Sequence, residues 1–177
     1  NMAREYARYV PKSSGKYYGA YRVGDIMFIV FDCGEDKPDD FWVYAGLTDF
    51  DGYRTEQAAW FGELIRSKAY KSAKWRIVMN HFPPLSHMES DNPERHGIQD
   101  ITDKFLPLYN QAKIDLMISG HTHAYEFMSP DKYDRLTFPV IVNSTESVAR
   151  IDIDGRTLKA KVTDTGGNTL KEFTISK

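Results

Sequence analysis

The stretch that decides the fold is WRIVMNHFPP, residues 75–84, and a second stretch of the same kind is IDLMISGHTH, residues 114–123. Each begins with a short apolar run of the length of a buried strand. The first run is followed by His81 and the second by His121. Two prolines come soon after His81, and proline cannot extend a strand ladder. Both stretches are therefore predicted to be strands that stop at a histidine.

Two helical patterns accompany these strands. One helix is predicted after Thr55, a typical N-cap residue, because apolar residues then recur at helical spacing: Ala58, Phe61, Leu64 and Ile65. A second helix is predicted over residues 101–112, with Pro107 kinking or restarting it. The segments between these elements, residues 34–53 and 85–99, are polar and rich in turn-forming residues, so both are predicted to be loops.

Further strand patterns lie at the two ends of the chain. Tyr17–Arg22 and Ile26–Asp32 are predicted to form a hairpin that enters a buried strand. After Pro139 the chain is predicted to form antiparallel strands at one edge of the core or over it: Val140–Asn143, Val148–Ile153, Thr157–Thr163 and Thr169–Ile175. The alternation of strands and helices before them indicates parallel βαβ units, so the predicted fold class is α/β, in a single domain over residues 1–177.

Composition and charge exclude several classes of protein. The chain has 177 residues, of which 41% are hydrophobic and 27% charged, as in an ordinary globular domain. Its net charge of −2 gives no basic excess to hold a nucleic-acid backbone. No apolar run approaches the ~20 residues that span a bilayer, so no membrane segment is predicted. The single cysteine, Cys33, is interpreted as a small buried hydrophobe.

Three histidines are candidate metal ligands. His81 and His121 each follow a predicted parallel strand, and ligands of open α/β sheets bind beyond the carboxyl ends of the strands. His123 lies two residues after His121, and such residues face the same way in an extended backbone. Imidazole is a good ligand for Zn, Fe and Mn, so a metal site is the natural hypothesis. His87 and His96 lie in the predicted polar loop and are interpreted as solvated or on the substrate side.

These residues carry a resemblance to a known family. The segments Asn80–Pro84 and Gly120–Glu126 resemble the last two metal-binding motifs of the calcineurin-like metallophosphoesterases, and Gly-His-x-His-x-Tyr-Glu is particularly similar to the purple acid phosphatase branch. The likeness extends more loosely to the strand that ends at Asp32, to the helix around Glu56–Phe61 and to the terminal hairpin from Ala149 to Ile175.

The resemblance implies a fold and a chemistry. It implies the carboxyl-terminal half of a metallophosphoesterase-type βαβ sandwich with a terminal antiparallel hairpin. In the intact protein it implies hydrolysis of phosphate esters at two transition-metal ions ~4 Å apart, with Fe, Zn and Mn as candidates. His81 and His121 would bind the second metal and His123 the first. The resemblance places the catalytic histidine upstream, so no catalytic residue is assigned in this chain, and it favours a periplasmic or extracellular location.

The sequence also departs from the family pattern. The only Gly-Asp pair, Gly24-Asp25, has no Asp or Tyr three residues after Asp25, and no Asn-His-Glu segment occurs. The chain is therefore expected to be a partial domain that lacks the amino-terminal metal-binding motifs. Without a bridging carboxylate, two dications repel each other, so weak binding of a single metal and no efficient hydrolysis are expected. Half of such a sandwich would expose apolar sheet, which predicts self-association.

Two other interpretations remain open from the sequence. The chain is compatible with a non-catalytic interaction module in which the histidines are vestigial. It is also compatible with a small mononuclear zinc hydrolase that uses three histidines and a water molecule. Substitution of His81, His121 and His123 separates the first alternative from the enzyme, because only the enzyme needs these side chains.

Overall fold

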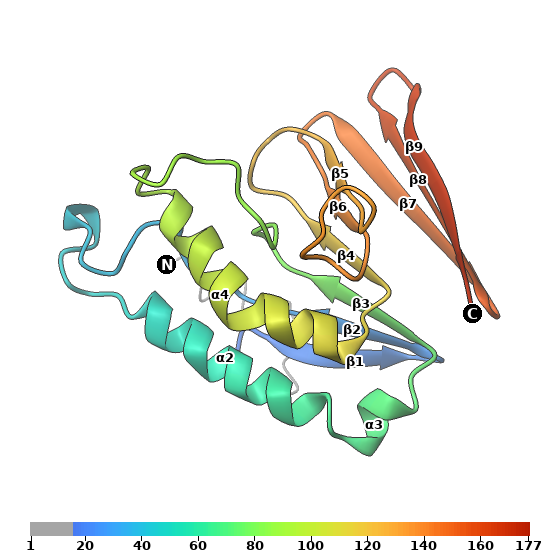
Figure 1. The fold of residues 1–177 in the computed structure, drawn as a ribbon, viewed down its shortest axis with the longest axis horizontal. Helices are drawn as coiled ribbons and strands as arrows, with labels where there is room; N and C mark the ends of the chain where they lie inside the picture. Colours follow the sequence, from blue (N-terminus) through green and yellow to red (C-terminus); the bar gives the residue numbers. More distant parts are fainter. Residues whose placement is uncertain (1–15) are drawn as a thin grey trace.

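The computed structural model describes residues 16–177 and is built around a six-stranded mixed sheet (Figure 1). The spatial order of its strands is β1 (Gly19–Val23), β2 (Ile26–Val30), β3 (Trp75–Met79), β4 (Leu116–Ser119), β6 (Val140–Val142) and β5 (Glu126–Met128). The four central strands are parallel, and the edge strands β1 and β5 are antiparallel to their neighbours. The predicted α/β class is confirmed, with a mixed sheet in place of a wholly parallel one.

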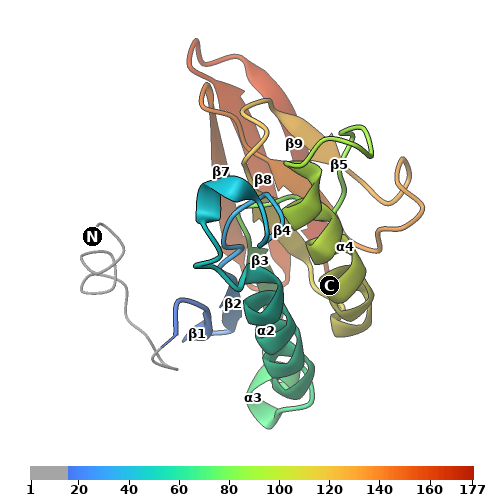
Figure 2. The ribbon, with the colours of Figure 1, turned by 90° about the vertical axis from the view of Figure 1, so that its left-hand side faces the viewer.

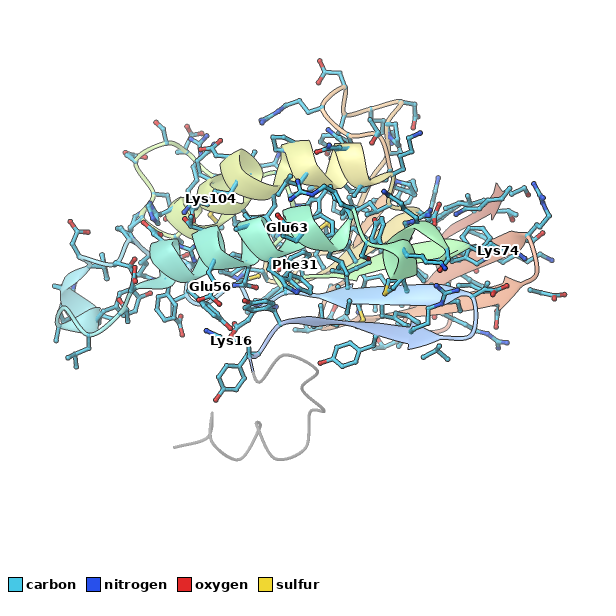
Figure 3. The ribbon with its side chains drawn as sticks, turned by 90° about the horizontal axis from the view of Figure 1, so that it is seen from below. Lys16, Phe31, Glu56, Glu63, Lys74 and Lys104 are labelled. Atoms are coloured by element: carbon cyan, nitrogen blue, oxygen red, sulfur yellow. The ribbon has the colours of Figure 1, made fainter. Side chains whose placement is uncertain are left out.

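Helices cover one face of this sheet (Figures 1 and 2). They are α2 (Phe50–Leu64), the single turn α3 (Lys68–Lys71) and α4 (Arg95–Ala112), and a short 3-10 helix, η1 (Trp42–Tyr44), precedes them. Phe31 lies between the sheet and these helices (Figure 3), with its ring 5.3 Å from that of Phe61 and 5.1 Å from that of Phe105. This aromatic cluster joins β2, α2 and α4 in one core.

A three-stranded antiparallel sheet covers the other face (Figure 2). It consists of β7 (Ser147–Asp154), β8 (Thr157–Asp164) and β9 (Thr169–Ser176). Alternate residues of β8 are buried, and they pack on Trp75, Ile77 and Leu116 of the main sheet: Leu158, Ala160 and Val162. Within residues 16–177 both faces of the main sheet are therefore covered, and self-association stays a prediction.

Several predicted boundaries are wrong. Helix α2 begins at Phe50, five residues before Thr55, because the carboxylate of Asp49 accepts the backbone N–H of Gly52 and forms the N-cap. Helix α4 begins at Arg95, inside the predicted second loop, and continues through Pro107 without a restart.

The end of the chain also differs from the prediction. Strand β6 was expected among antiparallel tail strands, but it pairs in parallel with β4 in the main sheet. Strand β5 was not predicted at all. The three predicted strands that follow are confirmed as β7, β8 and β9, which pair antiparallel in a sheet of their own. No helix among residues 16–177 is long and apolar enough to cross a membrane. The predicted domain begins at residue 1, and residues 1–15 of it lie outside the described residues.

Candidate metal centre

The ends of β3 and β4 bring His81 and His121 together. The parallel ladder continues past both strands, since Asn80 N–H donates to the Ile118 carbonyl at 3.1 Å and Gly120 N–H donates to the His81 carbonyl at 2.9 Å. The two imidazole rings lie with centroids 5.2 Å apart and planes at 82°. The residues predicted from two strand ends therefore meet in space.

The third histidine is placed differently from the prediction. His121 and His123 have φ angles of +72° and +58°, so the backbone between them is a turn in the left-handed region and not an extended segment. The argument that residues two apart face the same way therefore does not apply. His123 is exposed, whereas the side chain of His121 is only 16% exposed. Within residues 16–177, no ring contact links His123 to His81 or His121.

The surroundings of His121 shift the pKa of its imidazole. Burial lowers the pKa of its imidazole most, and the proximity of His81 lowers it further. Asp36 and Glu94 act in the opposite direction, and His123 adds a smaller lowering effect. A metal binds the deprotonated nitrogen of a neutral imidazole. The environment of His121 therefore favours the protonation state that a metal ligand needs.

Asp36 is a residue of this site that the sequence analysis missed. Its Oδ2 atom lies 4.0 Å from Nε2 of His121. Asp36 belongs to the segment that follows β2. Because β2 lies parallel to β3, the carboxyl end of β2 lies at the same edge of the sheet as His81. The rule applied to the strands before His81 and His121 would have drawn attention to the segment after β2, but its first carboxylate is Asp32, and no sequence signal singles out Asp36.

A buried polar cluster lies under His81. The Cys33 thiol donates to Asn80 Oδ1 at 2.6 Å, and its sulfur accepts the backbone N–H of Phe82 at 3.2 Å. The Asn80 amide in turn donates to the Phe82 carbonyl at 3.0 Å. Burial raises the pKa of the Cys33 thiol to about 12, so it stays protonated. The predicted burial of Cys33 is confirmed, but its thiol is hydrogen-bonded and not a purely hydrophobic group. Its hydrogen bonds fix both neighbours of His81.

The two remaining histidines lie apart from this pair. His87 is exposed, and its Nε2 atom lies 3.0 Å from a carboxylate oxygen of Glu126. His96 lies in the first turn of α4, and its Nε2 atom is 2.9 Å from both carboxylate oxygens of Asp51. His96 therefore joins α4 to α2, and it is not the solvated loop residue that was predicted.

An open cavity of about 400 Å³ adjoins the histidine turn. Thr122 and Ala124, on either side of His123, line it together with apolar residues of the segment after β3 and of α4 and β5: Pro83, Leu85, Met88, Ile98 and Met128. The paired side chains of His87 and Glu126 also border it. His81, His121 and His123 are not among its lining residues, so the cavity lies beside the histidine pair and not over it.

The donor set fits only part of a metal site. His81 and His121 supply two neighbouring nitrogen donors of a type that suits Zn, Fe and Mn. Across the described residues, no group of three or more His, Cys, Asp or Glu side chains is arranged to hold an ion. Two neighbouring imidazoles do not by themselves make a complete metal site.

Comparison with known families shows to which family the chain belongs. The sequence profile of the family described as calcineurin-like phosphoesterase matches residues 3–125, more than half of the chain and a range that includes all three candidate histidines. The chain belongs to the calcineurin-like phosphoesterase family. The predicted resemblance is thereby confirmed, and the terminal sheet β7–β9 lies beyond the matched residues.

Among curated proteins, several purple acid phosphatases are similar to this chain. It is 29% identical over 99 residues to the probable purple acid phosphatase 20 of Arabidopsis thaliana, covering 54% of this chain and 22% of that protein. It is 27% identical over 82 residues to purple acid phosphatase 1 of Ipomoea batatas, covering 45% and 17%. The matched segments thus span about a fifth of these relatives.

Solved structures share the fold. A purple acid phosphatase from yellow lupin seeds (Lupinus luteus) superposes with a TM-score of 0.58 at 15% identity, covering 95% of this chain and 34% of that one. A protein described as GAP50, the anchor in the inner membrane complex of Plasmodium, superposes with a TM-score of 0.51 at 16% identity, covering 90% and 53%. The mixed sheet with its packed antiparallel sheet is therefore a phosphoesterase-type arrangement.

Proposed function

We propose that the intact protein is a metal-dependent hydrolase of phosphoric esters in which His81, His121 and His123 are metal ligands. The observation that carries this proposal is the meeting of the His81 and His121 rings, 5.2 Å apart, at the carboxyl ends of two adjacent parallel strands. Family membership supports the reaction class, and the purple acid relatives support a dinuclear centre of Fe, Zn or Mn.

Each side chain of the site has a distinct part in this proposal. A bound transition metal supplies charge neutralisation at the phosphoryl oxygens and activation of water. His81 and His121 hold it through neutral nitrogens, and the lowered pKa of His121 suits that role. His123, on the exposed outer side of the turn, is assigned to the other metal of the pair. The cavity beside the turn receives the organic part of the ester.

For the 177 residues alone we propose weak binding of one metal ion and no efficient hydrolysis. The sequence contains no Gly-Asp-x-x-Asp, Gly-Asp-x-x-Tyr or Gly-Asn-His-Glu segment. Without a bridging carboxylate, nothing anionic offsets the repulsion between two dications a few ångströms apart.

A chromogenic phosphate monoester tests the proposal. The 177-residue chain is assayed with excess Mn²⁺ or Zn²⁺, and a longer chain that includes the upstream sequence is assayed beside it. We expect turnover only in the longer chain, with loss of activity and of bound metal in its His81→Ala and His121→Ala variants. Unchanged metal content and activity in these variants would favour the non-catalytic module. Turnover by the 177 residues at the level of the longer chain would refute the argument from the missing carboxylates.

A further inference from the structure

The carboxylate of Asp36 faces the imidazole of His121 with one particular oxygen. Its Oδ1 atom accepts from the Lys37 ammonium at 2.8 Å, which leaves Oδ2 for His121, at 4.0 Å from Nε2. Lys37 also lies 3.4 Å from a carboxylate oxygen of Glu94. Both Asp36 and His121 are largely buried, with side chains 15% and 16% exposed. The contact therefore occurs in a partly desolvated place, where electrostatic interactions are stronger than in water.

The backbone that carries Asp36 is fixed from two sides. The guanidinium of Arg54, fully buried, donates to the Cys33 carbonyl at 2.7 Å and to the Glu35 carbonyl at 3.2 Å. On the other side, the N–H of Gly97 in α4 donates to the Asp36 carbonyl at 2.6 Å. The segment between Cys33 and Asp36 is thus held by α2 and by α4 at once.

Arg54 is in turn held by carboxylates. Its Nε atom donates to Asp100 at 2.6 Å, and its second terminal nitrogen donates to Asp51. The ammonium of Lys104, which projects from α4 (Figure 3), donates to Asp100 and to the Asp51 carbonyl, both at 2.8 Å. A buried guanidinium so fully paired has one orientation. The position of Asp36 next to His121 therefore follows from a rigid network.

A carboxylate beside one ring nitrogen decides which nitrogen of the histidine carries the proton. The carboxylate favours N–H at the nitrogen that faces it, so the other nitrogen presents its lone pair. Here the facing atom is Nε2, which leaves Nδ1 for a ligand. The 4.0 Å separation is longer than a hydrogen bond, so at this distance the carboxylate acts on the ring through its charge.

We propose that Asp36 is the positioning residue of His121: its carboxylate holds the proton on Nε2 and orients the ring so that Nδ1 faces the metal. The metal part of this inference rests on the proposed function, whereas the position of the proton does not. Lys37 confines the carboxylate, and Arg54 and Gly97 fix the backbone beneath it.

Long-range ¹H–¹⁵N correlation spectra of the imidazoles, recorded on the metal-free chain at pH 7.5, test the position of the proton. In the wild type we expect His121 to carry its proton on Nε2. Asp36→Ala should admit the Nδ1–H form, and so should Asp36→Asn, which keeps the size of the side chain but removes its charge. Glu35→Ala is the matched control, because it removes an adjacent exposed carboxylate that is not paired with His121.

Calorimetric titration of the same variants with Zn²⁺ tests the consequence for binding. Removal of an orienting partner lowers metal affinity by ~10- to 100-fold, so Asp36→Ala should weaken binding to that extent and Glu35→Ala by less than ~3-fold. An Nδ1–H form in the wild type, or equal affinities of the two alanine variants, overturns the inference. If the wild type binds no Zn²⁺ but the position of the proton is as described, the positioning holds and the metal part of the proposed function fails.

Discussion

Replacing Gly97 with alanine is expected to destabilise the protein, although alanine favours a helix over glycine by about 0.5–1 kcal/mol. Gly97 lies in the first turn of α4, against the segment that carries Asp36. A Cβ atom there would lie 2.6 Å from Cε2 of Phe82, 2.9 Å from Cα of Asp36 and 2.9 Å from the carbonyl oxygen of Glu35. Two of these three atoms belong to the backbone and cannot rotate away.

The expected size follows from setting the two effects against each other. Forcing one extra methyl into a tightly packed place costs about 1–3 kcal/mol, and the helix preference offsets up to about 1 kcal/mol of that. Because two of the three close atoms belong to the backbone, the cost is taken at its upper end, about 2–3 kcal/mol. The net loss is then about 1–2.5 kcal/mol, which corresponds to a fall in Tm of about 2–10 °C for a domain of this size. Urea unfolding followed by far-ultraviolet circular dichroism measures the loss.

Gly62 provides the matched control. It lies in α2, and a Cβ atom there would meet nothing within 4 Å. Gly62→Ala should therefore stabilise the protein by about 0.5–1 kcal/mol, the helix preference alone. If Gly97→Ala proved as stabilising as Gly62→Ala, the tight contact between α4 and the Asp36 segment would be refuted.

The remaining predictions concern the buried polar groups. Arg54→Met should lower the free energy of unfolding by about 3–5 kcal/mol in urea titrations, because it leaves the Cys33 and Glu35 carbonyls without their buried donor and leaves Asp100 with Lys104 alone. Arg66→Met, at an exposed ion pair, should change it by less than about 0.5 kcal/mol. Burial raises the pKa of Cys33 from 9.0 to about 12, so its contribution to stability is complete below pH 9 and is lost as the pH rises towards 12. Between pH 9 and 10.5 the wild type should therefore lose about 1.4 kcal/mol per pH unit more than Cys33→Ser, and parallel curves would contradict the burial argument.

The ends of β3 and β4, at His81 and His121, could be predicted from the sequence because the residues that mark them are adjacent in the chain. An apolar run that stops at a histidine, with prolines or a glycine beside it, fixes both the strand and the place of its last side chain. The neighbourhood of His81 and His121 then follows from the rule for parallel strands. The hairpin of β1 and β2 was equally local, with Gly24 at positive φ in its turn.

The features that the sequence did not predict depend on tertiary contacts. Asp49 and Thr55 are both acceptable N-caps, and the choice of Asp49 follows from Asp39, whose carboxylate accepts the N–H groups of Phe50 and Asp51. The left-handed backbone at His121 and His123 has only a weak signature in residue type, because histidine adopts such φ angles more often than most residues but far less often than glycine.

The most direct test of the metal centre is calorimetric titration of the 177-residue chain with Zn²⁺, for the wild type and for His81→Ala, His121→Ala and His87→Ala. The account predicts weak binding of one ion to the wild type. It predicts no binding to the first two variants and unchanged binding to His87→Ala, whose side chain lies with Glu126 and not at the site. Equal affinity of all four proteins would contradict the account, because the ion would then be bound by something other than the two imidazoles that meet at the strand ends.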